Sequence, residues 1–190
     1  AWPFALLALA AFAVGAWEWA RLNGAGTLSP LLGVVLAAVA IAALAGGWSA
    51  DAPPAAWWLA LIAWVVGGVL TLRRGTAGWP KAPQALRLAL GLVALWAAWL
   101  AFANAKALGL NFILSVFILV WAADVFAYFG GRAFGRRKLA PSISPNKSWE
   151  GVWSGVAGAL VVAAAWLLAE GALRVDTPSL FARLDARFGI

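Results

Sequence analysis

Six long apolar runs constrain the fold of this chain more than any other feature of its sequence. A transmembrane helix needs about 20 mainly apolar residues, and six segments meet this condition: 2–21, 30–47, 55–72, 85–103, 108–128 and 149–169. Clusters of Gly, Pro, Asn and charged residues separate the runs, as breaker residues separate helices. We therefore predict an all-α, polytopic integral membrane protein that forms a single transmembrane domain over residues 1–190.

The composition agrees with this class and excludes several kinds of chemistry. The chain is 65% hydrophobic and 11% charged, whereas a soluble domain is nearer half apolar and a quarter charged. It contains no Cys and no His, so catalysis has to use Asp, Glu, Lys, Arg, Ser, Tyr or a bound metal ion. We assign the net charge of +7 to loops that meet anionic lipid headgroups rather than to nucleic-acid binding.

The distribution of the basic residues predicts an orientation. Most of the 14 Lys and Arg residues lie at the end of the first run, at 73–87 and at 130–150, which fall on one side of the predicted membrane. Loops rich in Lys and Arg are usually cytoplasmic. We therefore expect the loop at 130–150 to lie in the cytoplasm, where nucleotides are available.

The tail at 171–190 is less apolar than the runs before it. Leu180, Phe181, Leu184 and Phe188 recur at helical spacing with charged residues between them, which is typical of an amphipathic helix at a membrane interface. A loop is the alternative interpretation. The chain begins at Ala1 and contains no Met, so we expect it to be processed, trimmed or a fragment of a longer chain.

Besides Glu150 at the start of the last run, two acids lie within apolar runs, where an ionisable group is energetically expensive and usually faces a protein interior or a wet cavity. Asp124 is either hydrated or paired with a base such as Arg132, or it is a ligand of Mg²⁺, which prefers oxygen ligands. For Glu18 we favour an i,i+3 pair with Arg21 over a role in a site.

The start of the last run carries the signals of a turn, a helix cap and an anion site. Pro145 and Asn146 are turn formers, Ser148 is a natural N-cap, and Glu150 suits the first helical turn. Lys147 beside the free N–H groups of a helix N-terminus would attract an anion. The glycines of a P-loop are missing, so this is not that motif.

The remaining small and polar residues of the last two runs indicate packing rather than chemistry. Gly151 and Gly155 are spaced for close approach of two helices, while Asn111 and Ser115 share one helical face and suit interhelical hydrogen bonds. The glycine pair at 130–131 and Gly135 would let the chain turn sharply away from its helix.

The sequence from 121 to 151 resembles the central region of the phosphatidate cytidylyltransferases, also called CDP-diacylglycerol synthases. The matching segments are DVFAY at 124–128, GRAFGRRKLAP at 131–141 and SPNKSWEG at 144–151. The segment AWEWARL at 16–22 also resembles an early helix of that family. Val125 and Phe126 stand where relatives commonly have small residues, and Asn146 replaces a frequent Gly.

The resemblance implies cytidylyl transfer from CTP to phosphatidate, with Mg²⁺ as cofactor, in the bacterial inner membrane. It implies catalytic roles for Asp124 and Lys147, with Asp124 also a candidate metal ligand. The residues expected to bind substrate are Arg132, Lys138, Ser144, Asn146, Lys147 and Ser148. We expect CTP, phosphatidate and membrane lipids as partners, we expect no nucleic acid, and we leave a homodimer open.

The family also carries a further C-terminal block of Lys, Asp, Gly and His residues, and this chain reaches Ile190 before any such block. We therefore expect a C-terminally truncated enzyme that is inactive alone. Two alternatives stay open at this point. One is a related CTP-dependent kinase that acts on a polyprenol or another lipid, and the other is a transporter or an anion-binding membrane scaffold.

Overall fold

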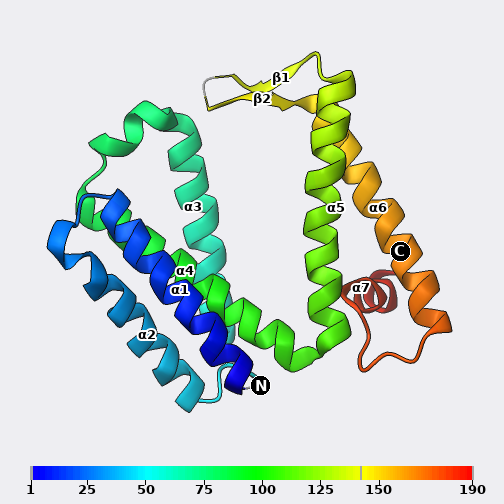
Figure 1. The fold of residues 1–190 in the computed structure, drawn as a ribbon, viewed down its shortest axis with the longest axis horizontal. Coiled ribbons are helices and arrows are strands. Elements are labelled where there is room, and N and C mark those ends of the chain that lie inside the picture. Colours follow the sequence, from blue (N-terminus) through cyan, green and yellow to red (C-terminus); the bar gives the residue numbers. More distant parts are fainter. Residues whose placement is uncertain (1, 142, 190) are drawn as a thin grey trace. The chain divides into compact units, whose positions relative to one another are not determined.

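A computed structural model describes residues 2–141 and 143–189. Its long helices are α1 (Trp2–Leu22), α2 (Ser29–Ala45), α3 (Pro54–Gly78), α4 (Gln84–Leu108), α5 (Leu110–Phe134) and α6 (Trp149–Ala172). The shorter elements are the 3-10 turns η1 (Gly26–Leu28) and η2 (Trp79–Lys81), the strands β1 (Lys138–Ala140) and β2 (Ser144–Ser148), and helix α7 (Leu180–Phe188). Six helices of the described chain are long and apolar enough to cross a membrane, which confirms the predicted polytopic class (Figure 1). The predicted all-α class also holds, apart from the short hairpin of β1 and β2.

The chain divides into two compact units, residues 1–107 and residues 108–190. In the first unit α1 packs along α2, and α4 adds Trp99 and Leu100 to their core. The indole N–H of Trp99 donates to the carbonyl of Ala5 at 3.1 Å. Glu18 and Arg21 form the predicted i,i+3 ion pair at 2.8 Å. Helix α3 is the least buried candidate span, so most of its apolar surface is available to lipid.

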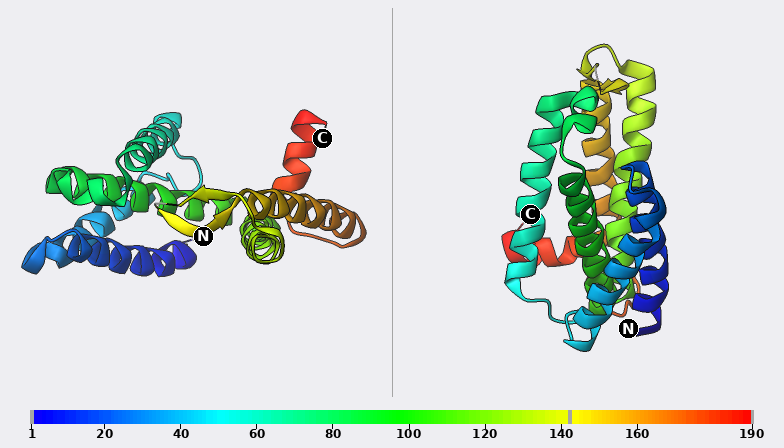
Figure 2. Two further views of the ribbon diagram at one scale, coloured as in Figure 1. Left: turned by 90° about the horizontal axis from the view of Figure 1, so that it is seen from above. Right: turned by 90° about the vertical axis from the view of Figure 1, so that its left-hand side faces the viewer.

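In the second unit α5 and α6 run side by side, and glycines allow the close approach (Figure 2). A methyl group placed at Gly155 would lie 2.8 Å from the carbonyl oxygen of Ala123, and one at Gly151 would lie 2.9 Å from that of Ala127. The packing role predicted for these glycines is therefore confirmed. Gly130 stays within α5 and faces Ser154 of α6, so the part of the predicted turn at 130–131 is wrong. The chain leaves the helix at Gly135, the third glycine of that prediction, which is the extended residue after α5.

Helix α7 packs against α5 and α6 in the half of this unit that is farther from the hairpin (Figure 1). Ser115 accepts a hydrogen bond from the N–H of Leu180 at 2.9 Å, and Asn111 accepts one from the indole of Trp166 at 3.1 Å. These contacts confirm the interhelical role predicted for both polar residues. The helical spacing of the tail is also confirmed, and the loop interpretation of 180–188 is wrong.

The segment between α5 and α6 differs from its prediction. Pro145 and Asn146 lie in strand β2 rather than in a turn, and the turn comes earlier, at Pro141 and Ile143. Strands β1 and β2 pair antiparallel, with Lys138 opposite Ser148. Hydropathy carries no signal for this hairpin because its strands are short and largely exposed.

Candidate functional site

Ser148 ends strand β2 and caps helix α6. Its backbone is extended, with φ −132° and ψ 156°, and its hydroxyl accepts a hydrogen bond from the N–H of Gly151 at 3.2 Å. This confirms the predicted N-cap and leaves the positive end of the α6 dipole beside the hairpin. Ser148 is only 4% exposed, so the cap is a fixed part of the site.

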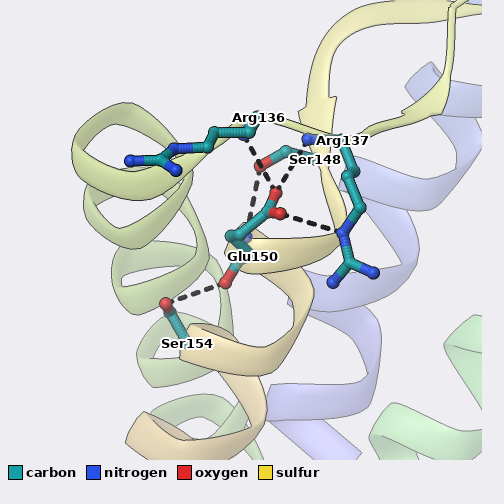
Figure 3. Close-up of polar contacts among 6 residues, drawn as sticks. Arg136, Arg137, Ser148, Glu150 and Ser154 are labelled. Carbon is teal, nitrogen blue, oxygen red and sulfur yellow. Dashed lines mark hydrogen bonds and ion pairs between the residues drawn. The ribbon is translucent and has the colours of Figure 1, made fainter.

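Glu150 fastens the hairpin to the same helix end. One carboxylate oxygen accepts the backbone N–H groups of Arg136 and Arg137, each at 3.1 Å, and the other accepts Nε of Arg137 at 3.1 Å (Figure 3). The main chain closes the junction further, because the N–H of Trp149 donates to the carbonyl of Arg137 at 3.0 Å. The sequence predicted Glu150 only as an acid in the first helical turn. Its hydrogen bonds to Arg136 and Arg137 could be found only in the folded chain.

A cavity of about 720 Å³ lies between the end of α5, the hairpin and the start of α6. We call it the basic pocket. It brings together five of the residues predicted to bind substrate, although they come from three elements. These residues are Arg132 of α5, Lys138 of β1, and Asn146, Lys147 and Ser148 of β2. None of the described lining residues is acidic, so the pocket is suited to an anion.

Glycines shape the wall of the basic pocket beside these cations. Gly131 and Gly135 both line it. A methyl group at Gly135 would lie 2.7 Å from the Ser148 hydroxyl oxygen, so only glycine lets the chain pass so close to the cap. The glycine-rich end of α5 was the sequence signal for this feature, although its purpose is close approach at the pocket rather than a turn at 130–131.

Two predicted site residues lie outside the basic pocket. Ser144 pairs with Ala140 at the other end of the hairpin and does not line the cavity. Asp124 lines a second cavity of about 670 Å³ between α5, α6 and α7, which we call the apolar groove. The two cavities share Ala127 and Val152 as wall residues, so they are neighbours along the α5–α6 pair.

Asp124 is the one charged residue among the described residues that line the apolar groove. Its side chain is exposed, and no hydrogen bond or ion pair reaches it from the described part of the chain. The predicted alternative of a pair with Arg132 is wrong, because Arg132 instead donates to the Tyr128 hydroxyl at 3.3 Å. Asp124 is therefore a free carboxylate near the basic pocket.

The donor set for a metal ion is small. No group of three or more Asp, Glu, His or Cys side chains gathers within the described ranges, and Glu150 already accepts three N–H groups. Among the described residues that line the two cavities, Asp124 is the one that offers carboxylate oxygens. One carboxylate suits Mg²⁺ where phosphates and water supply the remaining ligands, so the residues present fit that ion and exclude a cage built from them alone.

Comparisons with known proteins show the family of this chain. The chain matches the model of the Cytidylyltransferase family over residues 1–181. It is 41% identical over 166 residues to the phosphatidate cytidylyltransferase of Pseudomonas aeruginosa, an alignment that covers 81% of this chain and 57% of that protein. The chain thus spans little more than half the length of this relative.

Two shorter matches carry the same name. Identity is 69% over 55 residues with the phosphatidate cytidylyltransferase of Haemophilus influenzae, covering 29% of this chain and 19% of that protein. It is 45% over 60 residues with that of Bacillus subtilis, covering 32% and 22%. No solved structure is significantly similar to the chain. On the match over residues 1–181, this chain belongs to the cytidylyltransferase family.

Proposed function

We propose that this protein transfers the cytidylyl group of CTP to phosphatidate, giving CDP-diacylglycerol and pyrophosphate. The observation that carries the proposal is the basic pocket, which gathers Arg132, Lys138 and Lys147 at one end of two helices able to cross a membrane. Family membership supports a CTP-dependent reaction, and the names of the relatives support phosphatidate as the acceptor.

The proposed chemistry needs little from the protein beyond charge and alignment. An oxygen of the lipid phosphate forms a bond to the α-phosphorus of CTP. The bond from that phosphorus to the bridging oxygen breaks, and pyrophosphate leaves with its electron pair. The attacking oxygen is already ionised, so no general base is required. Both reactants are anionic, and fixed cations with a helix N-terminus lower the repulsion between them.

In this proposal Lys147 and Lys138 hold the nucleotide phosphates, with Arg132 at the opening beside Tyr128. The hydroxyl of Ser148 is engaged with the α6 backbone, so its contribution is to keep the helix end in place. We also propose that Ser144 and Asn146 contact the substrate, as predicted from the sequence. Asn146 lines the basic pocket, whereas Ser144 lies outside its described lining.

The apolar groove supports a lipid acceptor. Its described lining is apolar apart from Asp124, and it adjoins the basic pocket through Ala127 and Val152. A lipid whose phosphate lies in the basic pocket can extend an acyl chain along this groove. Asp124 then lies near the phosphate and would supply one oxygen to Mg²⁺, which when bound offsets phosphate charge and orients the reacting groups.

A CTP-dependent lipid kinase would use a similar pocket, and the position of a radioactive label separates the two reactions. We expect membranes that contain the protein to move label into lipid from CTP labelled at the α-phosphate and not from CTP labelled at the γ-phosphate. Transfer of the γ label instead would establish the kinase. Absence of both transfers from the well-folded protein as its gene encodes it would overturn the proposal.

We propose a location in the bacterial inner membrane with the hairpin in the cytoplasm, supported by the basic charge of the hairpin and by the bacterial relatives. A homodimer stays a proposal as well. The mass of the purified protein in detergent, corrected for bound detergent, is the measurement that decides it.

A further inference from the structure

The carboxylate of Glu150 makes contacts that its position in the helix does not explain. An acid in the first turn is ordinarily favoured by the dipole of its own helix. Here the side chain reaches across to the segment that leaves α5 and accepts two backbone N–H groups and one guanidinium N–H, all at 3.1 Å (Figure 3). Glu150 thus joins two parts of the chain that are 13 and 14 residues apart.

The backbone bonds carry most of this constraint. The side chain of Arg137 is 72% exposed while that of Glu150 is 22% exposed, and an ion pair between exposed groups contributes little. Hydrogen bonds from N–H groups to a charged acceptor are stronger and less dependent on side-chain freedom. Glu150 therefore anchors mainly the main chain at 136–137, and its bond to the Arg137 side chain adds little.

Lys138 follows this anchored segment directly and lines the basic pocket. The carbonyl of Arg137 accepts the N–H of Trp149, and Lys138 lies opposite Ser148 in the hairpin. The chain just before Lys138 is thus held at both its N–H and its carbonyl groups. Glu150 itself does not line the pocket, so it acts on a ligand only through the residues it holds.

We infer that Glu150 is a positioning residue that sets Lys138 at the basic pocket by anchoring the main chain at 136–137 to the start of α6. The phosphate ligand in this inference rests on the proposed function, whereas the anchor itself does not. Both carboxylate oxygens of Glu150 accept hydrogen bonds within the anchor, and Arg137 belongs to the anchor rather than to the pocket.

Hydrogen exchange tests the anchor without any substrate. In the protein as its gene encodes it, purified in lipid nanodiscs, we expect Glu150→Ala to speed amide exchange at 135–138 at least about tenfold, since each lost bond to a charged acceptor shifts local opening by about that factor. Glu150→Gln keeps an acceptor oxygen for the backbone and should restore most of the protection. Unchanged exchange in Glu150→Ala would overturn the inference.

Kinetics and binding test the consequence for the pocket. We expect Glu150→Ala to raise KM for CTP roughly tenfold with a smaller change in kcat, and to weaken pyrophosphate binding by a similar factor. Glu18→Ala is the matched control, because it removes an exposed carboxylate from an ion pair outside the pocket. Its KM for CTP and its affinity for pyrophosphate should stay as in the parent protein. An unchanged KM and unchanged pyrophosphate binding in Glu150→Ala contradict the inference.

The two readouts separate this inference from the proposed function. If Glu150→Ala loosens 135–138 but the parent protein binds neither CTP nor pyrophosphate, the proposed function fails and the anchor stands. If the parent protein binds CTP and Glu150→Ala binds it equally well, the anchor has no role at the pocket. A general loss of protection throughout α6 in Glu150→Ala would assign Glu150 to folding instead, and Glu150→Gln should then show the same loss.

Discussion

At the scale of single residues, the basic run after α5 separates into different roles. Arg132 and Lys138 line the basic pocket, Arg137 bonds to Glu150, and the side chain of Arg136 is exposed outside both. Four cations that look equivalent in the sequence are therefore not interchangeable. Positive charge near a membrane explains all four in the same way, and only the folded hairpin distinguishes them.

Lys147 is the residue whose loss should affect the reaction most directly. We expect Lys147→Ala to lower kcat/KM for CTP roughly hundredfold, because it removes a fixed cation from the pocket proposed to hold phosphates. Lys81→Ala is the control, since Lys81 is an exposed cation in η2 that does not line the pocket. Steady-state CDP-diacylglycerol formation measures both, and full activity of Lys147→Ala would remove Lys147 from the site.

A change at Asp124 should alter the proposed dependence of the rate on Mg²⁺. Asp124→Asn keeps the size of the side chain but removes its charge, so we expect a rise of about tenfold or more in the Mg²⁺ concentration that gives half-maximal rate. Titration of Mg²⁺ at saturating CTP measures the shift. A lower rate with an unchanged half-maximal Mg²⁺ concentration would assign Asp124 a role in the apolar groove and not in metal binding.

At the scale of the elements, α5 and α6 depend on small residues, and the tail depends on hydrogen bonds to the start of α5. Gly151, Gly155 and Gly158 all face α5 so closely that a methyl group would collide with it. At the other end, Asp176 accepts the N–H groups of Leu110 and Asn111, groups that a helix N-terminus leaves without intrahelical partners.

Gly155→Ala should destabilise the α5–α6 pair. Its new methyl group would lie 2.8 Å from the carbonyl oxygen of Ala123, and overpacking of this kind costs about 1–3 kcal/mol. Gly171→Ala is a matched control in the same helix, where the added methyl group meets open space, and it should be neutral or stabilising by up to about 1 kcal/mol. Thermal unfolding in detergent compares the two. Equal melting temperatures would contradict the packing role.

Asp176 makes the tail sensitive to acid. Hydrogen bonds from the N–H groups of Asn111 and then Leu110 hold the pKa of Asp176 below its ordinary value of 3.8. A carboxyl whose pKa is lower in the folded state stabilises that state above its unfolded pKa, and this stabilisation is lost as the pH falls through the lowered pKa. We therefore expect docking of the tail to weaken below about pH 4.

Asp176→Asn should remove this acid sensitivity and loosen the tail at neutral pH. Limited proteolysis at 173–189 between pH 3 and 7, with an acid-active protease, measures the effect. Asp185→Asn is the control, because no hydrogen bond or ion pair reaches its carboxylate from the described residues. A parent protein and an Asp176→Asn variant that are cut equally at every pH would contradict the role of Asp176.

At the scale of the whole molecule, the chain is a multi-pass membrane protein of the cytidylyltransferase family that folds as two compact units. The second unit holds the basic pocket, the apolar groove and the tail. Helix α6 has 24 residues, which gives a length of about 36 Å, enough to cross a hydrocarbon core of about 30 Å. The hairpin and the tail loop must therefore lie on opposite sides of a membrane that α6 spans.

Cysteine labelling tests this orientation cleanly, because the chain contains no Cys of its own. We expect Val175→Cys to react with a membrane-impermeant maleimide added to intact spheroplasts, and Ile143→Cys to react only after the membrane is permeabilised. The reverse pattern would place the hairpin outside the cytoplasm. Labelling of both from one side would show that α6 does not span the membrane.

The sequence alone determined the class of the protein, the number of long helices, the cap at Ser148 and the packing glycines of α6. These features depend on local quantities, namely the transfer free energy of successive side chains and the spacing of residues on one helix. The motif resemblance also named five residues that the structure then gathered in one pocket.

The tertiary structure alone decided which neighbouring residues face that pocket. It separated Ser144 and Asp124 from the other candidates, divided the basic run, and joined Glu150 to the chain at 136–137. The reason is physical: the hairpin has little apolar surface to mark it in the sequence, and its register is set by pairing between segments and by the start of α6. Such contacts between distant positions have no periodic pattern along the chain.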